Sequence, residues 1–265
     1  TLSMKAIPAL AHSVSNIIKS LYGKNKKAFA LDLDNTLWGG IVGDDGPDNL
    51  KIGKETPTGE AYTEFQEYLK AHQQLGVILN VISKNENENA LAGLAHPEMT
   101  LKSDDFITIK ANWKPKSQNL LDVAHTLSLM PDSFVFVDDN PAERDLIRQQ
   151  VRNAAVPEVG DKPEGFIRAI DKMGYFEMTV VSADDAGREK MYKENAERAK
   201  AELAFSDYRA YLLSLNMKAE IEAFIPAYHG RIAQLSNKSN QFNLTTRRYT
   251  QAEIEQIAAD ESYIT

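Results

Sequence analysis

The sequence predicts an α/β fold in which a doubly wound parallel sheet is covered by helices on both faces. Two observations lead to this prediction. Strand-like and helical segments alternate between residues 24 and 178. The strand-like segments are also apolar throughout, which is typical of parallel strands buried on both faces. The chain has 265 residues, a length that suits one large domain, alone or with a smaller module.

The order of the expected elements follows from the apolar periodicity and the turn residues between segments. In chain order we expect a helix at 5–21, strand 26–34, a loop or small hairpin at 38–53, helix 59–76, strand 77–85, helix 86–95, strand 104–111, helix 115–127, strand 133–140 and a candidate fifth strand at 153–159.

Helix boundaries are indicated by capping residues. Gly23 and Gly76 follow the first two helices as stop signals, and Pro115 opens the helix that ends near residue 127. Asn85 is expected to cap the helix at 86–95. Asn140 is expected to be the N-cap of a helix with Pro141 at its first position and Glu143 at the capping-box position.

The composition changes after Thr179. We expect a charged helix at 182–203, a helix at 206–217, a single strand at 218–225, a short helix at 225–237 and a polar segment up to 250. One strand cannot form a sheet alone, so this tail either packs on the main domain or begins a further module. The predicted division is therefore 1–23 as helix and linker, 24–178 as the main domain, and 179–265 as a helical linker with an incomplete module.

Charge and composition exclude several classes of function. The net charge of −8 disfavours nucleic acid as the main partner. The absence of cysteine excludes disulfides, thiolate catalysis and zinc–thiolate sites. Neither a membrane-spanning apolar run nor a signal-peptide pattern is visible, so we expect a cytoplasmic protein without a membrane partner. The five histidines lack the spacing of metal ligands.

Four polar clusters lie where predicted strands end or the next helix begins. This edge of an open parallel sheet is where ligands bind. The clusters are Asp32 with Asp34, Ser83 with Asn85, Lys114 with Lys116, and Asp138 with Asp139.

This set of side chains suits phosphoryl transfer. A carboxylate can attack phosphorus and hold it as an aspartyl phosphate. A second carboxyl group can protonate the leaving oxygen and later activate water. Mg²⁺ prefers carboxylate and phosphate oxygens, and a lysine and a hydroxyl group would hold the remaining phosphate charge. We therefore expect a phosphatase or phosphotransferase that acts on a phosphorylated small molecule.

The order of these clusters resembles the haloacid dehalogenase (HAD) superfamily, whose pattern here is D-L-D-N-T from Asp32 to Thr36, followed by Ser83, Lys116 and the acidic pair. The resemblance implies that Asp32 is the nucleophile and a metal ligand. It implies that Asp34 is the general acid and base and binds the metal through its carbonyl. Ser83 and Lys116 would hold the phosphoryl group, and Asp139 would bind Mg²⁺ with Asp138 beside it.

Five longer segments are similar to the FkbH-like branch, subfamily IIIC. They are LDLDNTLWGGIVGDDG, VISKNEN, NWKPKSQNL, FVFVDDNPAERDLIR and QLSNKSNQFNLTTRRYT. Members of that branch are implicated in transferring a glyceryl unit from a glycolytic bisphosphate to an acyl carrier protein, with loss of phosphate. The branch usually continues into an acetyltransferase-like fold, and this sequence is expected to end within that region.

Four further expectations concern access and alternatives. No large cap fits between the motifs, so the site should be open to a large substrate. Trp38 and Asn85 are candidate substrate-binding residues, with ordinary packing as the alternative for Trp38. A phospho-switch or a scaffold that docks a carrier protein is the competing function, although receiver domains place their acidic pair after the first strand. Arg247, Arg248 and Lys238 are either a phosphate-binding group or a solvated face.

Overall fold

The computed structural model describes residues 3–178, 191–195, 197–198, 207–238 and 243–264. It divides into two compact units. One unit comprises residues 25–197, and the other combines residues 1–24 with 198–265. The first predicted helix therefore groups with the C-terminal segment. The predicted boundary at residue 178 adjoins residues 179–190, which lie outside the described part.

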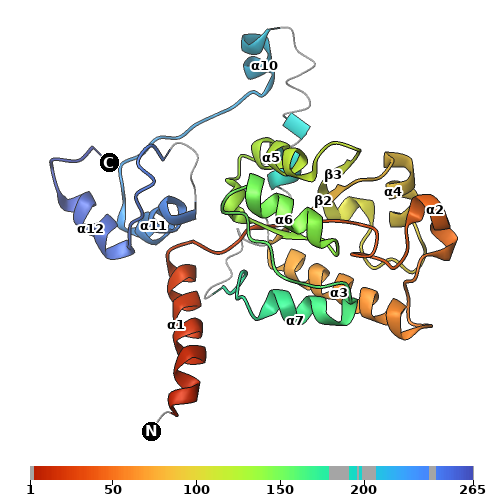
Figure 1. Cartoon of the computed structure of the whole chain (residues 1–265). Coiled ribbons are helices and arrows are strands. Elements are labelled where there is room, and N and C mark those ends of the chain that lie inside the picture. The colour runs from red at the N-terminus through yellow and green to blue at the C-terminus, as the bar shows by residue number, and fades with distance from the viewer. Residues whose placement is uncertain (1–2, 179–190, 196, 199–206, 239–242, 265) are drawn as a thin grey trace. The chain divides into compact units, whose positions relative to one another are not determined.

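The larger unit is built on a four-stranded parallel sheet (Figure 1). Its strands are β1 (Ala28–Leu31), β2 (Ile78–Ser83), β3 (Phe106–Ala111) and β4 (Phe134–Val137), in the spatial order β3-β2-β1-β4. Ala28 in the central strand β1 pairs with Ile78 on one side and with Phe134 on the other. All four strands therefore end at the same edge of the sheet.

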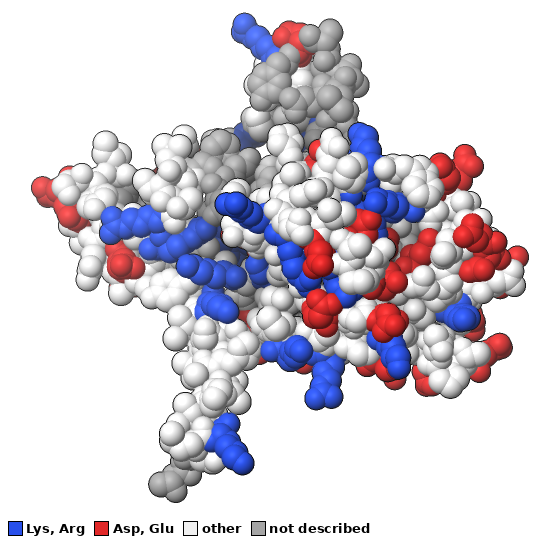
Figure 2. Space-filling model, in the orientation of Figure 1, with Lys and Arg blue, Asp and Glu red and all other residues white. Residues whose placement is uncertain are grey.

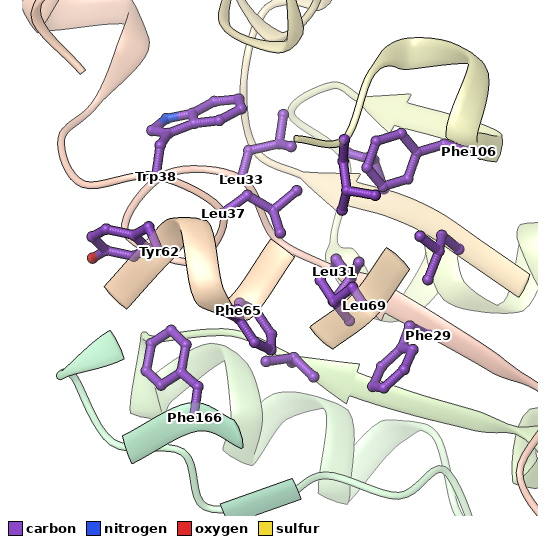
Figure 3. Packing of buried hydrophobic residues seen from close by; sticks show 14 of the residues in the cluster. Phe29, Leu31, Leu33, Leu37, Trp38, Tyr62, Phe65, Leu69, Phe106 and Phe166 are labelled. Carbon is purple, nitrogen blue, oxygen red and sulfur yellow. The ribbon is translucent and has the colours of Figure 1, made fainter. Parts of the chain in front are cut away.

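Helices cover both faces, as the apolar strands predicted. They are α2 (Val42–Asp45), α3 (Pro57–Gln74), α4 (Asn87–Leu94), α5 (Lys116–Thr126), α6 (Pro141–Gln150) and α7 (Phe166–Asp171). Phe29 and Leu31 pack in one apolar cluster with side chains of α3, α4 and α7 (Figure 3). Ala28 and Ala30 pack in a second cluster with side chains of α5 and α6. The prediction of a doubly wound α/β fold is confirmed.

A buried glutamine on α3 fixes the loop that follows β1. Gln66 is fully buried, and its amide nitrogen donates to the carbonyl of Leu37 at 2.7 Å. Its amide oxygen accepts from the backbone N–H groups of Thr100 and Leu101 at 2.9 and 3.0 Å. One side chain thus satisfies three buried backbone groups and holds the β1–α2 loop at the end of the sheet.

Two details of the sheet differ from the sequence prediction. The segment 38–53 contains the short helix α2 and a single antiparallel bridge between Gly39 and Lys51, not a full hairpin. The candidate fifth strand at 153–159 is wrong, because only Ala155 forms a bridge, with Val135. Pro157 has no N–H and cannot donate to a ladder, which explains why the pairing stops there.

Two capping predictions were also wrong. The N-cap of α4 is Glu86, without a side-chain cap, and Asn85 donates elsewhere. The N-cap of α6 is Asn140 as expected, but its side chain accepts from the N–H of Ala142 and forms no capping box. Glu143 instead pairs with Lys84, with 2.5 Å between Oε1 and Nζ.

The smaller unit is helical in its described residues. It contains α1 (Ile7–Leu21), which follows the 3-10 turn Met4–Ala6, and then α10 (Tyr208–Ser214), α11 (His229–Lys238) and α12 (Gln251–Ala259). The predicted strand at 218–225 is wrong, because this segment forms no strand and Ile221 is exposed. Helix α12 was not predicted; a capping box between Thr250 and Glu253 marks its start. Most of the predicted helix at 182–203 lies outside the described residues.

Two surface properties bear on partners. Among the described residues, no helix combines the length and apolar character needed to cross a bilayer. Acidic side chains gather on the part of the larger unit around α2 (Figure 2), where Asp44, Asp45 and Asp48 are exposed. The local acidic charge would repel a phosphate backbone at that surface.

Candidate active site

The buried centre of the candidate site is a lysine between two aspartates. Lys116 Nζ lies 2.7 Å from Asp32 Oδ2 and 2.6 Å from Asp138 Oδ2. All three side chains are almost completely buried. Asp32 and Asp138 directly follow the adjacent strands β1 and β4, and Lys116 is the first residue of α5. A lysine is electrostatically unfavourable at a helix N-terminus, so its position there is explained by the carboxylates and not by helix stability.

A tight turn after β1 brings a third aspartate to this edge of the sheet. The N–H groups of Thr36 and Leu37 donate to the carbonyl of Leu33, and Asn35 adopts a positive φ of 54°. Asparagine tolerates this conformation better than most residues. The chain therefore turns at Leu33, two residues after the end of β1, and Asp34 lies in the turn.

Asp34 is held by three hydrogen-bond donors. Its Oδ1 accepts from the indole Nε1 of Trp38 at 2.9 Å and from the backbone N–H of Val42 at 3.1 Å. Its Oδ2 accepts from Nδ2 of Asn85 at 2.9 Å. Asn85 therefore contacts Asp34, the second aspartate of the D-x-D motif, and does not cap α4. Trp38 is completely buried, which agrees with packing, one of the two roles that its sequence position left open.

The acidic pair after β4 is positioned by two residues that the sequence analysis had not singled out. The hydroxyl oxygen of Thr36 accepts from the N–H of Asp139 at 3.2 Å. The buried Arg144 donates through NH1 to the carbonyls of Asp138 and Asp139 at 2.8 and 2.7 Å. Thr36 belongs to the D-x-D-x-T motif and could have been found there. Arg144 lies in the segment FVFVDDNPAERDLIR, but nothing in that pattern indicated that its side chain would bind the carbonyls of the acidic pair.

The carboxylates form a group that suits a hard divalent cation. Three carboxylate oxygens, one each from Asp32, Asp138 and Asp139, lie within 4.8 Å of one another. Asp32 Oδ1 is buried and has no hydrogen-bond partner among the described residues. A buried carboxylate oxygen without a donor calls for a further partner. An all-oxygen set of this kind fits Mg²⁺.

Three acidic groups at this site have raised pKa values. Burial and, next to it, the charge of Asp32 together raise the pKa of Asp138 to about 6, against the opposing effect of Lys116. Burial also raises the pKa values of Asp34 and Asp139, and Asp32 again adds to the effect. Burial alone would lower the pKa of Lys116, but the two carboxylates raise it overall, so the lysine stays charged.

The remaining predicted residues lie at the same edge of the sheet or outside it. Ser83 is buried at the last position of β2, and its carbonyl accepts from the N–H of Asn112. Lys114 is exposed, in agreement with the preference for Lys116. Lys238, Arg247 and Arg248 belong to the smaller unit, and Arg247 lies over the ring of Tyr249 at 5.0 Å. Residues 239–242 of the segment QLSNKSNQFNLTTRRYT lie outside the described residues.

A solved structure with this fold comes from Bacteroides fragilis. It is the N-terminal part of a protein containing a phosphatase domain, crystallised in complex with Mg, and it is 40% identical to this chain with a TM-score of 0.65. The match covers 68% of this chain and 48% of that one, so this chain spans about half of its length. The likeness to this phosphatase-containing chain agrees with the predicted α/β fold.

A second match carries no weight in the argument. It is the 3-deoxy-D-manno-octulosonate 8-phosphate phosphatase of Moraxella catarrhalis, crystallised with magnesium, phosphate and its sugar. It is 16% identical with a TM-score of 0.32, over 75% of this chain and 99% of that one. No family model and no curated protein matches the sequence.

Proposed function

We propose that the larger unit is a magnesium-dependent phosphatase that forms an aspartyl phosphate on Asp32. The observation that supports this most strongly is the buried Lys116 between Asp32 and Asp138, with Asp139 completing a three-carboxylate group. The 40% identity to a chain that contains a phosphatase domain and was crystallised with Mg supports the same reaction and the same metal.

In the first step, a carboxylate oxygen of Asp32 attacks phosphorus. A new bond forms between this oxygen and phosphorus, and the bond from phosphorus to the leaving oxygen breaks. The Asp34 carboxyl group donates its proton to that oxygen, which leaves as an alcohol. The raised pKa of Asp34 favours the protonated form that this step requires.

In the second step, the Asp34 carboxylate accepts a proton from water. The water oxygen attacks phosphorus, the bond to Asp32 breaks, and phosphate leaves. Both carboxyl groups return to their starting states, so atoms and charges balance. Because Asp34 alternates between acid and base, its contacts with Trp38 and Asn85 must hold it in one place through both steps.

The other residues stabilise charge. The Lys116 ammonium group, which stays protonated, would neutralise charge on the phosphoryl oxygens, and Ser83 would donate a hydrogen bond to them. Asp32, Asp138, Asp139 and the carbonyl of Asp34 would hold Mg²⁺. When bound, Mg²⁺ neutralises negative charge on the carboxylates and phosphate so that an anionic nucleophile can approach.

The resemblance to the FkbH-like branch extends this proposal to substrate and partner. A phosphorylated three-carbon acid would be the substrate, and an acyl carrier protein would accept the glyceryl unit. The short β1–α3 connection supports access for a large partner, because it contains only α2 and a 3-10 turn, Pro47–Asn49. A phospho-switch or scaffold role has no specific contact in its favour among the described residues.

The experiment is hydrolysis of an aryl phosphate with and without Mg²⁺. We expect turnover that depends on Mg²⁺, disappears with chelator and is lost in Asp32→Asn. Turnover that persists in Asp32→Asn, or that is unchanged by a chelator, would contradict the proposal. Addition of carrier protein and a phosphorylated three-carbon acid separates the two finer alternatives. A glyceryl adduct on the carrier supports transfer, whereas phosphate alone supports simple hydrolysis.

A further inference from the structure

Each oxygen of the Asp34 carboxyl group has its own set of donors. Oδ1 accepts two N–H groups, from Trp38 and Val42, which use both of its lone pairs. Oδ2 accepts one, from Asn85, and retains one lone pair. A proton on this group therefore fits on Oδ2 and not on Oδ1. This difference fixes the carboxyl plane as well as the oxygen that can exchange a proton.

The indole that donates to Oδ1 is itself fixed by packing. Trp38 is fully buried at one end of the apolar cluster, next to Leu33 and Leu37 (Figure 3). On its far side it abuts Gly93 of α4, where an added Cβ would lie 2.7 Å from Cη2 and 2.9 Å from Cζ2 of the ring. Such distances are far below van der Waals contact, so only glycine leaves room for the ring in this orientation.

We propose that Trp38 is a positioning residue, which fixes the Asp34 carboxyl group so that Oδ2 carries the proton for the leaving oxygen, and that Gly93 sets the place of its indole. This inference rests on the proposed phosphatase function. It assigns a role to a buried tryptophan whose indole N–H donates to Asp34. Helix α4 thereby influences the position of the Asp34 carboxyl group through the indole ring of Trp38.

The leaving group provides the test. An alkyl alkoxide is a poor leaving group and needs the proton from Asp34, whereas nitrophenolate leaves without it. The ratio kcat/KM reports only the steps up to departure of the leaving group, so it isolates the acid role from the later hydrolysis. The two probes are p-nitrophenyl phosphate and glycerol phosphate, each with saturating Mg²⁺.

We expect Trp38→Phe to lower kcat/KM for glycerol phosphate by about 10- to 100-fold and that for p-nitrophenyl phosphate by less than about threefold, because general acid catalysis contributes about 10²–10⁴-fold when it is needed. Gly93→Ala should give a smaller loss with the same selectivity. In the Trp38→Phe background Gly93→Ala should add little, because the indole atoms Cη2 and Cζ2 that its methyl group would displace are gone. Trp113→Phe is the matched control, since it removes the exposed indole of the chain's other tryptophan.

Asp34→Asn separates the two possible failures. If Asp34→Asn shows no leaving-group selectivity, the acid role within the proposed function is wrong. If Asp34→Asn lowers kcat/KM mainly for glycerol phosphate but Trp38→Phe lowers kcat/KM equally for both esters, the positioning role is wrong. A spectroscopic measurement covers the case in which Trp38→Phe does not fold. In folded Trp113→Phe protein, the single remaining indole N–H resonance should be protected from exchange and should shift in Asp34→Asn. An unprotected or unshifted resonance would overturn the inference.

Discussion

Lys116 Nζ and Asp32 Oδ2 lie 2.7 Å apart in a site from which solvent is nearly excluded. The lysine also contacts Asp138, so one cation offsets two buried carboxylates. Removing one member of such a group leaves uncompensated buried charge, which is far more costly than the net contribution of the intact group. The same contact that would prepare Asp32 for attack therefore also stabilises the fold.

Lys116→Met should destabilise the metal-free protein by about 3–5 kcal/mol, the cost typical of breaking a buried ion pair. Chemical denaturation without Mg²⁺ measures this. Lys114→Met, two residues away and exposed, is the matched control and should change stability by less than about 0.5 kcal/mol. Equal effects of the two substitutions would contradict the buried-charge explanation.

Arg144→Met should weaken both the fold and magnesium binding. The side chain loses its bonds to the carbonyls of Asp138 and Asp139, and buried acceptors without donors cost about 1–3 kcal/mol each. Calorimetric titration with Mg²⁺ should show a larger dissociation constant, that is, weaker binding. Arg148→Met on the same helix is the control at a more exposed site. It tests whether loss of any arginine from this helix is sufficient to weaken magnesium binding. Unchanged magnesium affinity in Arg144→Met would mean that the carbonyl contacts do not position the acidic pair.

The stabilisation by Mg²⁺ should grow between pH 5 and pH 7. The pKa of Asp138 is raised from its usual 3.8 to about 6 in the fold. Its ionisation therefore lowers stability as pH rises from the unfolded pKa through the folded pKa. Mg²⁺ binds the ionised carboxylates and counters this loss, so the gain in Tm on adding Mg²⁺ should be larger at pH 7 than at pH 5. An equal or larger gain at pH 5 would contradict the assignment of the metal to this group.

Gln66→Leu tests how the β1–α2 loop is held. The substitution leaves three buried backbone groups without partners and should reduce the free energy of unfolding by about 2–5 kcal/mol. Gln74→Leu on the same helix alters an exposed side chain and should have an effect below about 0.5 kcal/mol. A small effect of Gln66→Leu would indicate that water replaces the amide.

The four strands, and the meeting of Asp32, Lys116 and Asp138 at one edge of the sheet, could be predicted from the sequence because they depend on local patterns. Apolar runs identified β1 to β4, and the polar residues directly after them had to meet at one edge. The contacts of Asn85 and Trp38 could not be predicted in this way. Both bind Asp34 across a turn whose path depends on tertiary packing, including the contact of Trp38 with Gly93 on a helix more than fifty residues away.

The errors have a similar physical origin. The alternation of apolar residues at 218–225 resembles a strand, but a strand needs a neighbouring strand to supply hydrogen bonds, and the described residues provide none. The segment 153–159 lies beside β4, but Pro157 limits its pairing to a single bridge. Local sequence indicates what a segment prefers, whereas the available partners decide what it forms.

The central claim is covalent attack by Asp32 on phosphorus, and mass spectrometry of the acid-quenched enzyme tests it most directly. Protein mixed with a phosphorylated substrate and Mg²⁺ should carry one phosphoryl group on the peptide that contains Asp32. The adduct should be absent in Asp32→Asn. With p-nitrophenyl phosphate, whose leaving group needs no proton, it should accumulate in Asp34→Asn, where water is no longer activated. Phosphate release without any adduct on Asp32, or an adduct on another residue, would contradict the account.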